Sequence, residues 1–147
     1  MTALLAYFFL ALFLSFLCSL LEAVLLSTPS SYASILRKQN TTHGIRLERF
    51  KENINRPLAA ILTLNTFAHT LGAAGVGAKT LEIYGESSVA IASGILTLLI
   101  LIFSEIIPKT IGSVYWRGLI GSATAVIQVL IVFTYPLVLL AEFISNF

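Results

Sequence analysis

The sequence predicts an all-α integral membrane protein, formed by three transmembrane helices, cytoplasmic-side juxtamembrane helices and a last apolar segment that lies within one leaflet or crosses as a fourth span. Of the 147 residues, 57% are hydrophobic and 11% are charged, and the mean hydropathy is +0.92. A soluble domain of this size could not bury so much apolar surface. Apolar runs of membrane length occupy residues 3–26, 58–80 and 89–107,. We therefore treat residues 1–147 as a single membrane domain.

The first run, residues 3–26, is predicted to be a retained span. It is not preceded by a basic region, and its apolar stretch is longer than that of a signal peptide,. Cys18 is the only cysteine. The chain therefore has no intramolecular disulfide and no thiolate metal cluster, and we expect Cys18 to be a small packing residue.

Charge predicts the orientation in a plasma or inner membrane, because cytoplasmic loops collect Lys and Arg. Loop 27–57 contains six basic residues against Glu48 and Glu52: Arg37, Lys38, Arg46, Arg49, Lys51 and Arg56. The connection 81–88 contains Glu82 and Glu86 and no basic residue. Loop 27–57 is therefore predicted to be cytoplasmic, with the amino terminus outside.

Residues 30–55 are predicted to form a cytoplasmic hairpin of two short amphipathic helices, interrupted by the stretch NTTHG at 40–44,. The basic residues of this hairpin would face the anionic headgroups of the bilayer, the expected lipid partner. A solvated hairpin with no lipid role is equally consistent with the pattern.

The last apolar stretch, residues 118–141, is long enough to span but contains Gln128, Thr134 and Pro136. A fourth span would place the carboxyl terminus outside. A helix within the inner leaflet would leave it in the cytoplasm.

Polar residues recur on one face of each predicted span at helical spacing. The three stripes are Ser15, Ser19 and Glu22; Asn65, His69 and Gly72, beside Thr66; and Gly94, Leu98, Leu101 and Glu105, beside Thr97 and Ser104. Ser19 and Asn65 each lie about seven residues from the cytoplasmic end, a depth of roughly 10 Å. Oxygen-bearing side chains from three helices are therefore expected to converge in the inner half of the membrane.

The stretch FSEIIPKT, residues 103–110, supplies the chemistry for a cation. Pro108 has no amide hydrogen, so the carbonyl of Ser104 is predicted to lose its helical partner beside the carboxylate of Glu105,. A neutral and an anionic oxygen at a helix break suit a hard cation. As an alternative, Glu105 pairs with Lys109, Pro108 only ends the helix, and Asn65 is interhelical glue.

Two further features have structural interpretations. His69 is expected to be packed or hydrogen-bonded rather than a ligand, because no second His, Cys or Asp accompanies it at metal-site spacing,. The stretch GAAGVGA at 72–78 is expected to be a close-packing surface, with a dimer interface possible there.

The segments SLLEAVLLS (19–27), NRPLAAILTLN (55–65) and GILTLLILIFSEIIPKTIG (94–112) resemble the transmembrane domain of the cyclin-M (CNNM) and CorC magnesium transporters. The resemblance covers nearly the whole chain. It implies a homodimer of three-span subunits, with Mg²⁺ as the transported ion, export coupled to Na⁺ and no organic cofactor. It also implies that Ser19 and Asn65 supply oxygens to the ion, that Glu105 and Pro108 belong to a broken third helix, and that residues 118–141 lie within one leaflet.

The chain departs from the family pattern at four positions. Ala23 stands where members usually have a hydroxyl residue, Ser104 where they tend to have Gly, and Thr66 and His69 where they tend to have Asn. The sequence also ends at Phe147, without the nucleotide-binding CBS modules of typical members. A natural short member, a truncated form and a membrane subunit with a separate cytoplasmic regulatory partner are all open.

The predicted function is therefore binding and transport of Mg²⁺. The expected metal ligands are Ser19, Asn65, Ser104 and Glu105, and the expected pathway or supporting residues are Glu22, Thr66, His69, Thr97 and Pro108. The alternative is a degenerate, non-transporting membrane module with a structural or regulatory role, favoured by Ala23. An enzyme is disfavoured because the chain has no HExxH and no paired Asp. Nucleic-acid binding is disfavoured by a net charge of only +2,.

Overall fold

A computed structural model describes residues 2–146, and within that range every regular element is helical. The elements are α1 (Thr2–Ser27), α2 (Ser30–Lys38), α3 (Thr42–Glu52), α4 (Asn55–Tyr84), the 3₁₀ turn η1 (Glu86–Ser88), α5 (Val89–Leu99), the π-helical segment η2 (Ile100–Ile106), α6 (Ile107–Phe133) and α7 (Tyr135–Ser145). This confirms the predicted all-α fold class.

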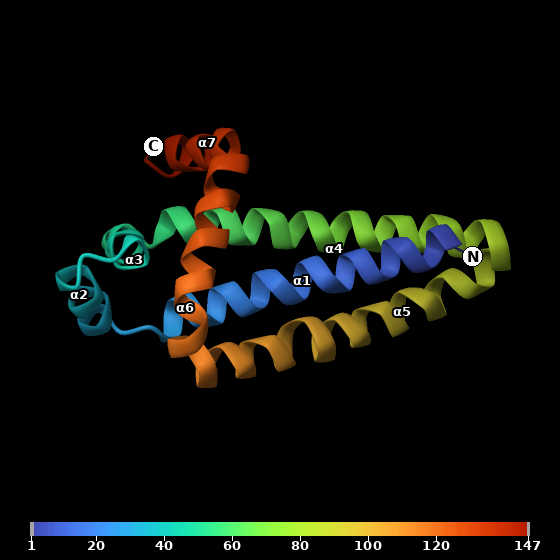
Figure 1. The fold of residues 1–147 in the computed structure, drawn as a ribbon. Coiled ribbons are helices and arrows are strands. Elements are labelled where there is room, and N and C mark those ends of the chain that lie inside the picture. Colours follow the sequence, from blue (N-terminus) through green and yellow to red (C-terminus); the bar gives the residue numbers. More distant parts are fainter. Residues whose placement is uncertain (1, 147) are drawn as a thin grey trace.

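Three helices are long and apolar enough to cross a membrane: α1, α4 and the continuous helix Glu86–Phe133. Figure 1 shows α1 between α4 and α5, and α1 packs most extensively against α4 and α6. The amino terminus and the η1 turn lie at one end of this bundle, and α2 and α3 lie at the other. The two ends therefore separate the acidic connection from the basic hairpin.

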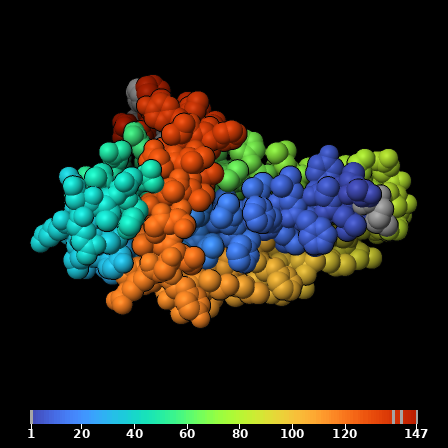
Figure 2. Space-filling model, in the orientation of Figure 1, coloured from blue at the N-terminus to red at the C-terminus, as the bar shows by residue number. Residues whose placement is uncertain are grey.

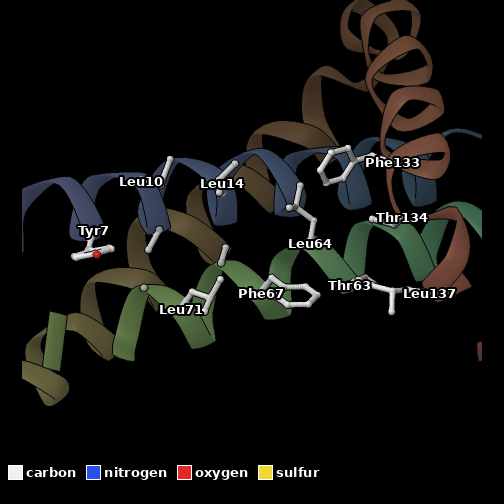
Figure 3. Close-up of a pocket in the computed structure, with 13 residues that line it drawn as sticks. Tyr7, Leu10, Leu14, Thr63, Leu64, Phe67, Leu71, Phe133, Thr134 and Leu137 are labelled. Atoms are coloured by element: carbon white, nitrogen blue, oxygen red, sulfur yellow. The ribbon is translucent and has the colours of Figure 1, made fainter. Parts of the chain in front are cut away.

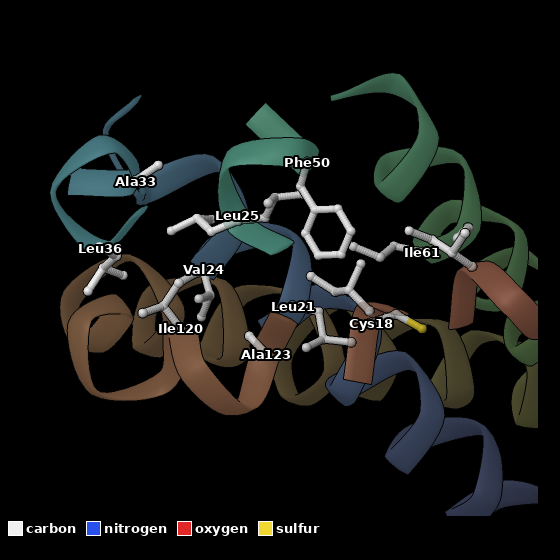
Figure 4. Packing of buried hydrophobic residues seen from close by; sticks show 14 residues of the cluster. Cys18, Leu21, Val24, Leu25, Ala33, Leu36, Phe50, Ile61, Ile120 and Ala123 are labelled. Carbon is white, nitrogen blue, oxygen red and sulfur yellow. The ribbon is translucent and has the colours of Figure 1, made fainter. Parts of the chain in front are cut away.

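The apolar core lies at the hairpin end of the bundle (Figure 4). Leu21 and Leu25 of α1 pack there with Leu47 and Phe50 of α3 and with Ile120 of α6, and all five side chains are buried. The apolar face of the amphipathic hairpin thus packs against protein. The buried apolar residues of its amphipathic pattern are explained by this core contact.

The break between α2 and α3 has a local cause. Asn40 adopts a left-handed conformation with φ of 59°, which Asn tolerates better than most residues,. Thr41 then caps α3 by accepting a hydrogen bond from the Gly44 amide at 3.2 Å,. These two residues turn the chain where the NTTHG stretch predicts an interruption.

The third long helix does not end near residue 107, as the 89–107 prediction has it. It continues through Pro108 into α6, with a kink at Tyr115, where φ is −105° and ψ is 20°. The predicted break is replaced by the wider turns of η2, in which the amide of Ile107 donates to the carbonyl of Ile102 five residues back,. A widened turn accommodates the missing amide of Pro108 while the helix stays continuous.

Beyond the kink, α6 crosses α1 and α4 instead of running alongside them (Figure 1). Figure 2 shows α6 and α7 lying over the bundle near its hairpin end, whereas the amino-terminal part of α1 stays uncovered on the same face. This arrangement favours the in-leaflet alternative for residues 118–141 over a fourth span.

Small residues permit the closest helix contacts. A Cβ placed on Gly72 of α4 would collide with the Cβ of Ala11 on α1, and one on Gly75 would meet the ring of Tyr7. A Cβ on Gly77 would meet nothing within 4 Å. The GAAGVGA stretch is therefore a packing surface within the chain at two of its glycines.

Candidate functional site

Polar side chains from three helices meet in the middle of the bundle, around His69 of α4. Its Nε2 atom lies 2.6 Å from Ser15 Oγ on α1, at hydrogen-bonding distance, and 3.9 Å from Glu105 Oε1 on η2. Ser104, next to Glu105, donates a hydrogen bond from its hydroxyl to the Leu12 carbonyl of α1 at 3.0 Å. These contacts bring α1, α4 and η2 together at one level.

The next layer of this cluster, one turn nearer the hairpin end, contains Ser19 and Asn65. The helices α1 and α4 are antiparallel, so four residues forward from Ser15 and four residues back from His69 lead to the same level, about 6 Å away,. Ser19 Oγ and Asn65 Oδ1 are buried, and neither has a hydrogen-bond partner. They are the buried side-chain oxygens left unpaired among the described residues.

The two acidic residues of the cluster have different partners. Glu22 Oε2 lies 3.7 Å from Lys109 Nζ, so the ion pair joins α1 to α6. The alternative pairing of Lys109 with Glu105 is therefore not the one that the structure adopts. Glu105 instead faces His69, and its carboxylate is about one-third exposed.

The π-helical segment η2 sets the direction of Glu105. With uninterrupted α-helical spacing, Glu105 would share a face with Gly94, Leu98 and Leu101. Leu98 and Leu101 are 56% and 45% exposed, however, and point away from the bundle. Because a π turn contains more residues than an α turn, the residues that follow are rotated about the helix axis. The predicted stripe of Gly94, Leu98, Leu101 and Glu105 is therefore wrong. Glu105 faces the bundle, and Leu98 and Leu101 do not.

The remaining predicted residues divide between the cluster and the outer surface. Pro108 is buried and follows Glu105 by three residues. Thr66 is exposed, and Thr97 is exposed with its hydroxyl donating to the Ser93 carbonyl of its own helix at 2.8 Å. The structure does not bring Thr66 or Thr97 to the cluster. It does bring Ser15, which the ligand prediction left out although it lies four residues before Ser19.

One apolar groove along the bundle is a poor alternative site for an ion. It has a volume of about 480 Å³ and lies between α1, α4 and the corner where α6 meets α7 (Figure 3). Tyr7, Leu10, Phe67, Leu71 and Phe133 line it. Its walls contain no charged side chain, so the polar cluster around His69 is the candidate site.

The donor set of the cluster limits the ions that it could hold. Among residues 2–146, no three His, Cys, Asp or Glu side chains gather closely enough to hold a metal ion by themselves. The available atoms are the carboxylate of Glu105, the imidazole of His69 and the neutral oxygens of Ser15, Ser19 and Asn65. A hydroxyl- and amide-rich set of this kind suits a cation that keeps part of its water shell.

Comparison with known proteins places this fold in a family. A family model described as the cyclin M transmembrane N-terminal domain matches residues 5–147. A UPF0053 protein of Synechocystis is 34% identical over 146 residues, which is 99% of this chain and 42% of that protein. The UPF0053 inner membrane protein YfjD of Escherichia coli is 29% identical over 76% of this chain and 26% of its own length.

The chain thus spans less than half the length of the curated relatives that it matches. The match nevertheless extends over almost every residue described above, including the polar cluster and the helix that passes through Pro108. The resemblance inferred from the sequence motifs is confirmed. The chain belongs to the cyclin-M transmembrane domain family.

Proposed function

We propose that this chain is the membrane domain of a cation transporter and that its ion is Mg²⁺. Ser19, Asn65 and Glu105 would supply side-chain oxygens, and a main-chain carbonyl near Ser104 would supply another. The observation that supports this proposal most strongly is the pair of unpaired buried oxygens, Ser19 Oγ and Asn65 Oδ1. They belong to facing positions of α1 and α4, one turn from the Glu105 carboxylate.

Unpaired buried oxygens favour a ligand because they are costly without one. A buried acceptor that has lost its water and gained no partner costs about 1–3 kcal/mol. Mg²⁺ is a hard cation that binds carboxylate, amide and water oxygens and seldom sheds its whole water shell. An ion that retains waters could satisfy both oxygens while Glu105 offsets part of its charge.

Pro108 supports the same proposal from the main chain. Pro108 has no N–H to donate. With α-helical bonding this leaves the Ser104 carbonyl without a donor, and with π-helical bonding it leaves the Phe103 carbonyl without one. The Ser104 carbonyl directly precedes Glu105 in sequence, and the Phe103 carbonyl lies one residue further back. At membrane depth such an oxygen is tolerated where it lines a polar site.

Transport would require the site to open to each side in turn. The ion pair between Glu22 and Lys109 joins α1 to α6 at 3.7 Å, nearer the hairpin end of α1 than Ser15 and Ser19. We propose that this contact closes the cytoplasmic side and separates as the helices rock. Export coupled to Na⁺ remains part of the proposal, as does assembly as a homodimer.

One observation favours the alternative, a degenerate module that does not transport. Ala23 has no side-chain oxygen, and a Cβ on Gly112 of α6 would lie only 2.8 Å from the Cβ of Ala23. The position is thus used for close packing of α1 against α6, where family members usually have a hydroxyl residue. The two functions differ in whether the chain binds an ion at all.

The thermal stability of the detergent-solubilised protein in increasing Mg²⁺ distinguishes them. A ligand at about 100 times its dissociation constant stabilises the folded state by roughly 2.7 kcal/mol. We expect wild type to gain this stability and Asn65→Ala and Glu105→Gln to lose the gain. Thr63→Ala is a matched control on α4, because its hydroxyl donates only to the Ala59 carbonyl of its own helix at 2.7 Å.

The outcome that contradicts the transporter is equally specific. If Mg²⁺ stabilises wild type no more than Ca²⁺ or Na⁺ does, or if the gain persists in both site variants, the degenerate module is the better account. If the gain is selective and lost only in the site variants, flux into liposomes becomes the next measurement.

A further inference from the structure

A polar cavity lies where α3 and the first turn of α4 meet α6. Figure 1 shows these three elements together at the hairpin end of the bundle. The volume of the cavity is about 120 Å³, whereas a single buried water needs about 10–15 Å³,. The described residues that line it are Arg49, Phe50, Asn53, Arg56, Pro57, Gln128 and Ile131. The cavity thus combines four polar side chains with apolar walls and has room for a polyatomic ligand.

The charges around the cavity favour an anion. Among the described residues that line it, none is acidic, and Arg49 and Arg56 are basic. Arg56 donates from Nε and Nη2 to the two carboxylate oxygens of Glu142, at 3.3 Å each. The Arg49 guanidinium has no ion-pair partner in the described part of the chain. Two positive charges and one negative charge leave a net charge of +1, which matches a monovalent anion.

The cavity also accounts for Gln128, the amide within the apolar stretch 118–141. A polar side chain in such a stretch is costly unless it has a hydrogen-bonding partner. Gln128 lines the cavity from α6, and Asn53 lines it from the connection between α3 and α4. Both amides have N–H groups that could donate to the oxygens of an anion. The helix α4 begins here without a side-chain cap, so the positive end of its dipole adds to the attraction,.

The place of the cavity in the fold suits a lipid headgroup. The helix α3 belongs to the basic hairpin, whereas the part of α6 that contains Gln128 belongs to the segment that we assign to one leaflet. A cavity between them lies at the level where headgroups meet acyl chains. Basic pockets between membrane helices on the cytoplasmic side bind anionic headgroups. The phosphate of a phospholipid is a diester with one negative charge, equal and opposite to the net charge of the cavity.

We propose that this cavity binds the phosphate of one anionic phospholipid, held by the guanidinium groups of Arg49 and Arg56 and by the amides of Asn53 and Gln128. The bound lipid would join the hairpin to α6. The inference goes beyond the proposed transport function, because the site is separate from the polar cluster. Arg56 precedes Asn65 by nine residues on α4, which is roughly 14 Å along the helix,.

Native mass spectrometry of the delipidated protein in a neutral detergent tests the proposal. Titration with phosphatidylglycerol counts the lipids retained and gives their dissociation constant. We expect one tightly retained phosphatidylglycerol per chain, and weaker retention of the zwitterionic phosphatidylcholine. Arg49→Gln and Gln128→Leu should each raise the dissociation constant for phosphatidylglycerol about tenfold, because each removes a donor to a charged oxygen.

The variants separate a defined site from general attraction to the membrane. Gln128→Leu leaves the charge of the protein unchanged. Arg46→Gln is the matched control, because it removes the same kind of charge from the same helix although Arg46 does not line the cavity. This control should retain the lipid as wild type does. Arg49 is exposed, and Leu at position 128 continues an apolar stretch, so both site variants are expected to fold.

Several results would overturn the inference. Equal losses in Arg46→Gln and Arg49→Gln, with none in Gln128→Leu, would indicate general attraction of the basic hairpin. Displacement of the lipid by inorganic phosphate would assign the cavity to a free anion. Retention of phosphatidylcholine as strong as that of phosphatidylglycerol, or no retained lipid at all, would also contradict it. These results leave the Mg²⁺ proposal standing, because that proposal is tested separately with Asn65→Ala and Glu105→Gln.

Discussion

At the scale of single residues, some hydroxyl groups of this chain bond within their own helix and others bond across helices. Those of Thr63, Thr110 and Ser113 donate to carbonyls four residues back in their own helices. Those of Ser15 and Ser104 reach a different helix. A hydroxyl bonded to its own helix is satisfied wherever the helix lies, whereas a cross-helix bond depends on the relative position of both helices. The bonds of Ser15 and Ser104 therefore depend on how α1 packs against α4 and η2 at the polar cluster.

Lys51 makes a contact between α3 and α1 at the hairpin end. Its ammonium donates to the Leu25 carbonyl, in the last turn of α1, at 2.7 Å. Removing this donor in Lys51→Met would leave a terminal carbonyl of α1 unpaired, so we expect a loss of about 1–2 kcal/mol in unfolding free energy. Lys38→Met, on the exposed side of α2, is the control and should stay near wild type.

The same contact has a pH dependence with a defined sign. Burial lowers the pKa of Lys51 below its ordinary value of 10.5. The unfolded chain therefore binds this proton more tightly, and the contribution of Lys51 to stability increases as the pH rises from the lowered pKa towards 10.5. Chemical denaturation of wild type and Lys51→Met should show a difference that grows over this window. A difference that shrinks instead would contradict the buried position.

At the scale of elements, the sequence predicts the helices well, but it predicts poorly which side of the third long helix faces the bundle. Hydropathy identifies α1 and α4, and the NTTHG turn separates α2 from α3, because these depend on local composition. The π-helical turns of η2 were not predicted. They arise from the missing amide of Pro108 together with packing against α1, and α-helical periodicity contains no sign of that packing.

The same limit applies to the candidate site. Ser19 and Asn65 were predicted from spacing and depth alone, and their side-chain oxygens are buried and unpaired; their role as ligands stays a prediction. The contact of His69 with Ser15 and Glu105 could not be predicted, because it depends on how η2 rotates the chain. Thr66 and Thr97, chosen because they adjoin polar stripes, point outwards.

Close contact between α1 and α6 is a property of the pair of helices, and Gly112 tests it. A Cβ added there would lie 2.8 Å from Ala23 Cβ and 3.0 Å from the Leu20 carbonyl. We expect Gly112→Ala to destabilise the fold by about 1–3 kcal/mol, because backbone atoms cannot move aside. Gly118→Ala on the same helix is the control, since a Cβ there meets nothing within 4 Å.

The control variant Gly118→Ala is expected to be as stable as wild type or slightly more stable, because Ala is more favourable than Gly in a helix by about 0.5–1 kcal/mol. Thermal unfolding of the two variants in detergent measures both effects. Equal stability of Gly112→Ala and Gly118→Ala would show that α6 does not pack on α1 as closely as described.

At the scale of the whole molecule, the prediction concerns orientation. The basic hairpin and the η1 turn lie at opposite ends of the bundle (Figure 1). By the excess of Lys and Arg, the hairpin is expected to be cytoplasmic. A membrane-impermeant thiol reagent added to intact cells should therefore label Glu86→Cys, and it should label Gln39→Cys only after permeabilisation.

The native thiol does not obscure this experiment. Cys18 is fully buried, so the unmodified chain is the low-background control. Labelling of Gln39→Cys in intact cells, with Glu86→Cys protected, would reverse the proposed orientation. Labelling of both without permeabilisation would contradict the separation of the two ends by the membrane.

The central place of α1 has a consequence for biogenesis. This helix is synthesised before α4 and η2, yet the Ser15 hydroxyl and the Leu12 carbonyl have their partners on those elements, 54 and 92 residues later in the chain,. During that interval the Ser15 hydroxyl has no partner helix. Membrane insertion and folding of this chain are therefore separate events. α1 remains in the bilayer without its contacts to η2 until residues near Pro108 have been translated.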